Sequence, residues 1–338
     1  MQLSDKRVLV TGGAGLVGSQ MVDDLVADND VTVADDLSNG IESSVHDDAE
    51  FVQADLTDES AVEAVIDGSF DAVFHFAAAD KYVNTDDPRP QFEENGEMTY
   101  NILERMDEVG VTNFAFTSSS TVYGEAPRPT PEDYAPLEPI SIYGSAKLSE
   151  EALLSTFAHS YDFTVWNFRF ANIVGPRFGA GVVPDFVEKL DENPDVLTIL
   201  GNGLQEKSYM HVTECTEAMR YVVENADDAM NTYNLGTRTT TSVNAIADIV
   251  ADVMDLDPEY VPLHRHADGA LRTVEHRGAM RDDDELCVAR EFVHHLADAF
   301  GVHGVEEGVH LVQRVERRGV VPLDGEDERE RGQRLFAP

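Results

Sequence analysis

Two residues of the sequence, Tyr143 and Lys147, have the types and the spacing of a catalytic base and its activator. They are four residues apart, so on a helix both side chains leave the same face about one turn apart. A positive charge near a phenol favours the phenolate, so we expect the pKa of Tyr143 to fall from its usual value of about 10 towards neutrality. Such a tyrosine can remove a proton from a sugar hydroxyl or a similar alcohol. Because any surface helix can carry this spacing by chance, the surrounding elements decide whether the pair is functional.

The first of those elements is a strand, a glycine turn and a helix near the N-terminus. The apolar run 7–10 leads into a glycine-rich turn and then into apolar residues at helical spacing. Gly12 permits the tight turn, Gly15 lets a pyrophosphate approach the backbone, and Gly18 lets the helix pack on the strand. The N–H groups at the start of the helix then face the phosphates. The pattern predicts a dinucleotide-binding turn, with a turn that holds no ligand as the alternative.

A carboxylate follows the second strand. Residues 31–34 read as a strand and end in Asp35, seventeen residues after Gly18. An acid at this place is expected to bind the adenine ribose hydroxyls and to repel the 2′-phosphate of NADP. The sequence therefore predicts NAD as the cofactor.

The same alternation of strand and helix continues to about residue 176. It predicts an α/β fold with a parallel, doubly wound (Rossmann) sheet, whose ligands bind beyond the carboxyl ends of the strands. Ser119 follows one such strand. His75 lies inside an apolar strand, so we interpret it as a packed, hydrogen-bonded histidine; a ligand or a base is the alternative. We expect an NAD-binding domain at 1–176, a smaller, mostly helical substrate-binding domain at 177–262, and an atypical tail at 263–338.

Charge is the unusual feature of the composition. The 338 residues include 65 acidic and 24 basic ones, and the acids are spread through every segment. Such a surface repels nucleic acid and anionic membranes, so we expect neither as a partner. Dense carboxylates suggest a cytoplasmic protein from a high-salt (halophilic) environment, with simple acidic drift as the alternative. The two cysteines form no disulfide framework, no apolar run approaches the ~18–20 residues that span a bilayer, and the N-terminus leaves no room for a signal peptide.

In these motifs the sequence resembles the extended short-chain dehydrogenase/reductase family, in particular its nucleotide-sugar epimerases and dehydratases. The resemblance covers roughly residues 5–262 and rests on motifs in family order: Thr11 to Gly18, Asp35 to Gly40, His75 to Ala78, Ser118 to Gly124, Tyr143 to Lys147, Arg169 to Arg177 and Gly201 to Val212. It implies bound NAD, a Ser-Tyr-Lys catalytic set, and a nucleoside diphosphate sugar, UDP-linked, lying between two domains. It also implies a homodimer formed through the helices near 91–109 and 143–158.

The resemblance also implies individual roles. Ser119 is the catalytic hydroxyl, Tyr143 the base, and Lys147 the residue that holds the nicotinamide ribose and lowers the tyrosine pKa. With Tyr143 and Lys147, the implied cofactor contacts are Gly12, Gly15, Leu16 and Val17 at the pyrophosphate, Asp35, Asp36, Asn39 and Gly40 at the adenosine, Asp55 and Leu56 at the adenine, and Phe76, Ala77, Ala78 and Asn95 beside the nicotinamide. Besides Ser119, the implied substrate contacts are Asn172 and Lys207. Lys207 stands where many family members carry arginine. Lysine keeps the positive charge but cannot donate two parallel hydrogen bonds to a phosphate as arginine does. A purely structural role for Lys207 is the alternative.

The loop after Ser119 indicates which reaction is favoured. Dehydratases of the family carry an Asp-Glu pair at this place and decarboxylases carry a glutamate, whereas this sequence has Ser120, Thr121 and Val122. Without an acid, the loop resembles that of 4-epimerases acting on UDP-glucose or UDP-galactose, which work through a 4-keto sugar. Another NAD-dependent dehydratase or dehydrogenase reaction on a nucleotide sugar, and a catalytically impaired NAD-binding protein, are the alternatives.

The tail departs from the family pattern. Residues 263–338 contain no lysine, serine, asparagine, isoleucine or tyrosine, but seven of the 11 histidines. We hypothesise a shifted reading frame or a replaced segment. An amphipathic helix at 282–300 and a zinc site built from the histidines between His264 and His310 are further possibilities, although no standard metal spacing is present; we predict no metal.

Overall fold

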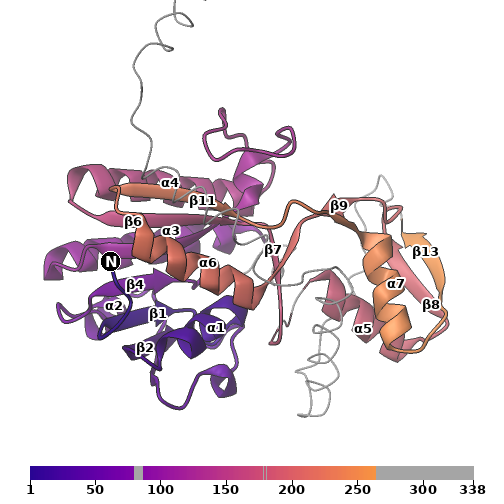
Figure 1. Ribbon diagram of the computed structural model, residues 1–338, viewed down its shortest axis with the longest axis horizontal. Helices are drawn as coiled ribbons and strands as arrows, with labels where there is room; N and C mark the ends of the chain where they lie inside the picture. Colours follow the sequence, from indigo (N-terminus) through magenta and orange to yellow (C-terminus); the bar gives the residue numbers. More distant parts are fainter. Residues whose placement is uncertain (80–86, 178, 180, 264–338) are drawn as a thin grey trace, which may run out of the picture.

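The computed structural model of the chain describes residues 1–79, 87–177, 179 and 181–263. The described part has a large lobe and a smaller lobe, joined by extended segments (Figure 1). No helix in these residues has the length and apolar character that crossing a membrane requires. The tail, with its predicted helix and its histidines, lies outside the described residues.

The large lobe is built on one sheet of seven strands. Every neighbouring pair is parallel, and the order across the sheet is β11-β6-β5-β4-β1-β2-β3. This order confirms the predicted doubly wound sheet. Its strands are β1 (Arg7–Thr11), β2 (Asp30–Asp35), β3 (Glu50–Gln53), β4 (Ala72–His75), β5 (Asn113–Ser119), β6 (Thr164–Phe170) and β11 (Met230–Leu235).

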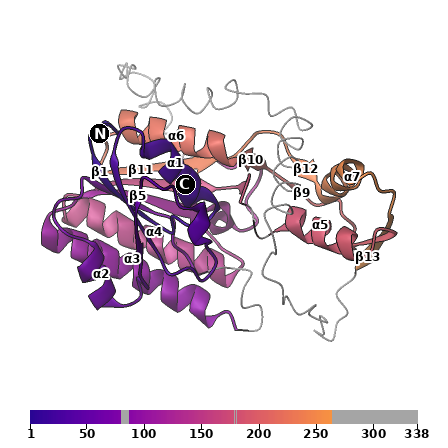
Figure 2. The ribbon, with the colours of Figure 1, turned by 90° about the horizontal axis from the view of Figure 1, so that it is seen from below.

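Helices cover both faces of this sheet (Figure 2). One face carries α1 (Leu16–Leu25) and α6 (Val212–Asn225); the other carries α2 (Glu59–Val65), α3 (Arg89–Val109) and α4 (Ile142–Ser160). Successive strand residues point to opposite faces, so Val8 and Val10 belong to the core under α1 and α6, while Leu9 belongs to the other core. Burial on both faces explains why these strands read as continuous apolar runs.

The smaller lobe has its own apolar core, which includes Phe186, Leu197 and Ile246. Its helices are accompanied by two strand pairs, β8 with β13 in parallel and β9 with β12 in antiparallel. The smaller lobe therefore contains short strands besides the helices that the sequence predicts for it. Its elements are α5 (Val182–Glu192), β8 (Val196–Leu200), β9 (Glu206–Lys207), β12 (Thr241–Ser242), α7 (Val243–Val253) and β13 (Glu259–Leu263).

The smaller lobe is formed by two separate chain segments, and the segment between them belongs to the large lobe. Beyond the sheet, β7 (Asn172–Val174) pairs with β10 (Tyr209–His211); α6 then packs on α1, and β11 pairs with β6 in the large sheet. Residues 212–235 therefore belong to the large lobe, which corrects the predicted assignment of the whole segment 177–262 to a substrate domain. A strand pattern in the sequence does not show which sheet the strand joins.

Candidate active site

Ser119 is the last residue of β5 and caps the short 3₁₀ helix η2 (Ser120–Tyr123). Its hydroxyl oxygen accepts the backbone N–H of Thr121 at 3.2 Å and the hydroxyl of Thr121 at 3.0 Å. Because the Ser119 hydroxyl is the acceptor in both bonds, its own proton is available to a ligand oxygen. The side chain is mostly buried at the carboxyl end of the sheet, where ligands of doubly wound folds bind.

Tyr143 and Lys147 lie in the first turns of α4. The Ser141 hydroxyl caps this helix by accepting the N–H of Gly144 at 3.0 Å, which satisfies one unpaired donor of the first turn. Tyr143 is half-buried, whereas Lys147 is only 1% exposed. The Lys147 ammonium lies 3.3 Å from Glu150 Oε1 and 4.7 Å from the centre of the Phe116 ring. The helix thus carries the lysine charge into the space between α4 and β5.

A glycine brings η2 against the start of α4. A Cβ atom on Gly144 would stand 2.9 Å from the carbonyl oxygen of Thr121, closer than real Cβ atoms come. Ser119 and Tyr143 lie within two residues of this contact, on opposite sides of it. The segments that carry Ser119 and Tyr143 are therefore in contact through Thr121 and Gly144.

The glycine turn has the form that the sequence predicted. Gly12 has φ +67°, and a Cβ atom there would lie 2.4 Å from the Ala77 nitrogen. A Cβ atom on Gly18 would lie 2.2 Å from the Gly12 carbonyl oxygen, so Gly18 packs α1 onto the turn. Gly15 differs, since a Cβ atom there would meet only the Gly12 oxygen at 3.4 Å. One side of the turn is therefore open beside Gly15, which caps α1 without a side-chain hydrogen bond.

Asp35 joins this turn to the end of β2. It is 8% exposed; its Oδ2 accepts the Ala14 N–H at 3.0 Å and its Oδ1 accepts the Leu37 N–H at 2.9 Å. Each carboxylate oxygen keeps a second lone pair, which can accept a ribose hydroxyl. Gly40 lies against Ala14 and Asp35, while Asp36 and Asn39 are exposed in the same loop.

The predicted contacts for the rest of the cofactor follow β3 and β4. Asp55 is exposed and its Oδ1 accepts the Thr57 hydroxyl at 2.7 Å, and Leu56 beside it is buried. Phe76, Ala77 and Ala78 follow β4 and are half-buried. Asn95 is completely buried, and its Oδ1 accepts the Ala79 N–H at 2.9 Å, so it supports this segment from behind.

Together these features fit a bound dinucleotide. The turn leaves room for a pyrophosphate only beside Gly15, and α1 begins there with backbone N–H groups that no side chain caps. The carboxylate expected at the ribose stands at the end of the neighbouring strand. Leu16 and Val17 begin α1 directly after Gly15 and are also half-buried.

The predicted substrate residues lie on the segments that run between the lobes (Figure 1). Asn172 opens β7, and its side-chain amide donates to the Ser208 carbonyl at 2.9 Å. Lys207, the residue before Ser208, is exposed in β9. Asn172 and Lys207 are thus on neighbouring segments.

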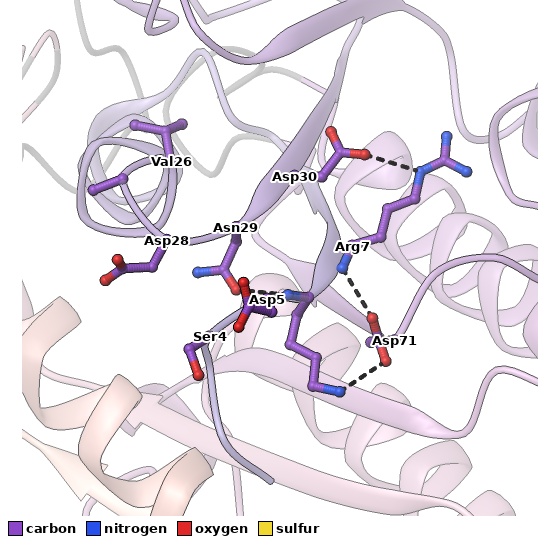
Figure 3. A pocket seen from close by; sticks show the side chains of 10 residues that line it. Ser4, Asp5, Arg7, Val26, Asp28, Asn29, Asp30 and Asp71 are labelled. Atoms are coloured by element: carbon purple, nitrogen blue, oxygen red, sulfur yellow. Dashed lines mark hydrogen bonds and ion pairs between the residues drawn. The ribbon is translucent and has the colours of Figure 1, made fainter.

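A surface pocket occurs at the opposite end of the large sheet (Figure 3). It is lined by residues 4–7, 26–30 and Asp71. Within it, Asp71 accepts the Lys6 ammonium at 3.1 Å and the Arg7 backbone N–H at 2.9 Å. Because this pocket lies at the amino ends of β1 and β2, it is separate from the candidate site.

Sequence reasoning missed a buried ion pair beneath Ser119. The Arg169 guanidinium binds both carboxylate oxygens of Glu151, at 2.9 and 2.7 Å, and donates to the Tyr123 hydroxyl at 2.7 Å. The Ser118 hydroxyl donates to the same carboxylate at 2.6 Å. Burial raises the pKa of Tyr123, with Arg169 partly opposing it, so Tyr123 is poorly suited to act as the base. No spacing in the sequence links these residues, because β6 and α4 meet only in the fold.

A second missed feature joins Lys147 to the glycine turn. The carboxylate oxygen Oε1 of Glu150, which binds Lys147, also accepts the Thr99 hydroxyl at 2.7 Å. Thr99 lies 3.2 Å from His75 Nε2, and His75 Nδ1 lies 2.6 Å from the Thr11 hydroxyl. His75 is therefore a packed, hydrogen-bonded histidine, as the sequence indicated. Its burial, together with the Lys147 charge, lowers the pKa of His75 to about 3, so the ring is neutral. The i,i+3 spacing of Lys147 and Glu150 was the available signal.

The sequence is similar to known proteins of one family. Residues 8–236 match the model of the NAD dependent epimerase/dehydratase family. The UDP-glucose 4-epimerase of Mycolicibacterium smegmatis is 32% identical over 271 residues, which are 76% of this chain and 86% of that protein. The dTDP-D-glucose 4,6-dehydratase of Homo sapiens is 30% identical over 256 residues, 72% of each chain.

A solved structure is also similar. The structure of the UDP-glucose 4-epimerase of Thermus thermophilus in complex with NAD superposes with a TM-score of 0.70 and 30% sequence identity. The superposition covers 93% of this chain and 100% of that one.

Proposed function

Because the chain belongs to the NAD-dependent epimerase/dehydratase family, we propose that it inverts the C4 hydroxyl of a UDP-sugar through a 4-keto sugar. NAD is the cofactor of this family, and when bound it accepts a hydride from the sugar and returns it. Since the hydride is returned, the reaction has no net redox change.

The residues of the chain supply the proton chemistry. Tyr143 as phenolate takes the proton of the C4 hydroxyl, and later returns it to the keto oxygen. Ser119 donates its available hydroxyl proton to the same oxygen, which stabilises negative charge there. The buried Lys147 ammonium, one turn along α4, favours the phenolate and provides donors for the nicotinamide ribose hydroxyls.

The observation that favours epimerisation is the chemistry of η2. Thr121 occupies the loop in which dehydratases of the family carry their acids, and its hydroxyl is committed to Ser119 at 3.0 Å. Val122 beside it is completely buried and apolar. Ser120 is not acidic either. The segment Ser120–Val122 therefore has no carboxyl group that could catalyse the elimination of water across C5 and C6 of the sugar.

Asn172 and Lys207 support a diphosphate-linked substrate. Asn172 lies in β7 and Lys207 in β9 of the smaller lobe, and Lys207 is one of 24 basic residues in a chain with 65 acidic ones. In such a negative field, a cation beside the diphosphate offsets repulsion of an anionic substrate.

The test is an assay of the purified full chain in molar salt with UDP-glucose, UDP-galactose and their N-acetyl forms. The proposal expects the 4-epimer as the product, at unchanged mass and without accumulation of NADH. A product lighter by one water would establish a dehydratase. This is the second candidate function, because the chain is similar to the human 4,6-dehydratase. Accumulating NADH would establish a dehydrogenase, and no product from any of the four sugars would contradict the proposal.

We also propose a homodimer formed through α3 and α4. Phe92 and Tyr100 on α3, and Tyr161 at the end of α4, are 48%, 44% and 45% exposed. Light scattering in molar salt is expected to give twice the chain mass, and Phe92→Glu is expected to lower it. A monomeric mass for the unmodified protein would exclude the dimer.

A further inference from the structure

The carboxylate of Glu150 lies underneath the lysine of the candidate active site. Glu150 is 0% exposed and Lys147 is 1% exposed, so their 3.3 Å ion pair is shielded from water and salt. The second oxygen, Oε2, is also buried and has no hydrogen-bond partner among the residues that the structure describes. A buried carboxylate oxygen left without a partner costs free energy of folding.

Hydrogen bonds hold this carboxylate in place. Thr99 donates its only hydroxyl proton to Glu150 Oε1, so towards His75 the Thr99 oxygen must accept. His75 therefore carries its proton on Nε2, and its Nδ1 accepts the hydroxyl proton of Thr11. The chain of donors runs in one direction from β1 through β4 and α3, and it ends on the Glu150 oxygen that also binds Lys147. Such an arrangement suits an ionised carboxylate.

We propose that Glu150 is a positioning residue that acts through Lys147: it fixes the ammonium and offsets part of its charge, and so sets the pH at which Tyr143 becomes a base. The inference rests on the proposed roles of Tyr143 and Lys147. A lysine without a counter-charge favours the phenolate fully, whereas a carboxylate next to it opposes the phenolate. The ion pair therefore makes Tyr143 a stronger base that ionises at a higher pH.

Among the residues that the structure describes, few other charges face this pair. On α4, Glu151 points to Ser118 and Arg169 and is matched by the Arg169 guanidinium. From α3 and β5 the neighbours are the uncharged Thr99 and Phe116. From β4 the neighbour is His75, which stays neutral because burial lowers its pKa to about 3. A change in the ionisation of Tyr143 on removal of the Glu150 charge can therefore be assigned to the Lys147–Glu150 pair.

The test measures Tyr143 directly. Tyrosinate absorbance is followed from neutral to alkaline pH, without substrate, for the full chain and for its Tyr143→Phe variant, and the difference is the titration of Tyr143. In the Glu150→Gln background, which keeps an acceptor for Thr99 but removes the charge, this titration is expected to move down by about one pH unit. The acidic limb of the pH profile of kcat/KM is expected to move in the same direction.

Two control variants separate charge from packing. Thr99→Val removes one hydrogen bond to the Glu150 carboxylate but keeps both charges, so the Tyr143 titration is expected to move less than in Glu150→Gln. Glu97→Gln removes an exposed carboxylate from α3, and it too is expected to leave the titration unchanged. If Glu150→Gln does not fold, Glu150→Asp, which withdraws the carboxylate by one methylene, is expected to give a smaller downward shift.

An unchanged or upward shift in both Glu150 variants would overturn the proposal. Because the titration needs no turnover, a failure of the proposed epimerase activity would show separately, as the absence of product from every sugar while the Tyr143 titration still responds to Glu150.

Discussion

Gly144 lies directly against Thr121: a Cβ atom on Gly144 would stand 2.9 Å from the Thr121 carbonyl oxygen. This contact leaves no room for a side chain between η2 and the first turn of α4. On the η2 side of the contact, the Ser119 hydroxyl accepts a hydrogen bond from Thr121. On the α4 side, Tyr143 is the residue before Gly144. The geometry of the candidate site therefore depends on a glycine within α4, where glycine is otherwise unfavourable by about 1 kcal/mol relative to alanine.

Replacing Tyr143 by phenylalanine is expected to reduce kcat at least ~100-fold, because the ring remains while the positioned base is lost. The control is Tyr161→Phe at the end of the same helix, where the ring is 45% exposed and activity is expected to persist. Steady-state assays of both variants in molar salt provide the measurement. Near-normal turnover of Tyr143→Phe would remove this residue from the proposed chemistry.

Gly12→Ala is expected to destabilise the protein by about 2 kcal/mol or more, because Gly12 has φ +67° and its Cβ atom would meet the Ala77 nitrogen at 2.4 Å. Gly96→Ala provides the contrast. Gly96 lies inside α3, and apart from the neighbouring backbone of that helix no described atom lies within 4 Å of its Cβ position, so we expect a gain of about 0.5–1 kcal/mol. Denaturant unfolding at constant salt measures both changes, and equal effects would contradict this account of the turn.

Gly15→Ala tests the open side of the turn. Gly15 has φ −85° and ψ 179°, which alanine adopts without strain, and its Cβ atom would meet only one oxygen at 3.4 Å. The stability of the cofactor-free protein should therefore change by less than about 0.5 kcal/mol. The affinity for NAD should fall about tenfold or more, because the methyl group occupies the place of the pyrophosphate. Calorimetric titration with NAD checks this, and unchanged affinity would place the dinucleotide elsewhere.

The buried histidine should make stability depend on pH. In the unfolded chain a histidine binds a proton below its usual pKa of about 6.5, but folded His75, with a pKa of about 3, does not. The unfolded state therefore binds more protons in this window, and the free energy of unfolding falls as the pH drops from about 6.5 towards 3.

For His75→Gln we expect a slope smaller by up to ~1.4 kcal/mol per pH unit, which unfolding curves between about pH 4 and 6.5 would show. Thr99→Val, which disturbs the same network but keeps the imidazole, should retain the original slope. Identical slopes for the unmodified protein and His75→Gln would contradict a neutral buried ring.

Local signals in the sequence predicted much of this molecule. The glycine turn, Asp35 at the end of β2 and the apolar strands follow from residue types over short stretches, and the structure places them as expected. His75 was also interpreted correctly, since a histidine in an apolar strand needs hydrogen-bond partners to be buried.

Contacts between distant elements could not be predicted in this way. The donor chain from Thr11 to Glu150 requires β1, β4, α3 and α4 to come into register, and no residue pattern records that alignment. The same limit applies to β11, because a strand pattern does not record that its partner is β6 of the large sheet.

The return of the chain to β11 also has a consequence for folding during synthesis. β6, with its apolar residues Val165, Trp166 and Phe168, is complete long before its outer partner β11 emerges, because α5, β8, β9 and α6 are made in between. Until then β6 is an open edge strand, which invites pairing with another unfinished chain. An excess of acidic over basic residues throughout the chain would keep nascent copies apart by repulsion while that edge is exposed.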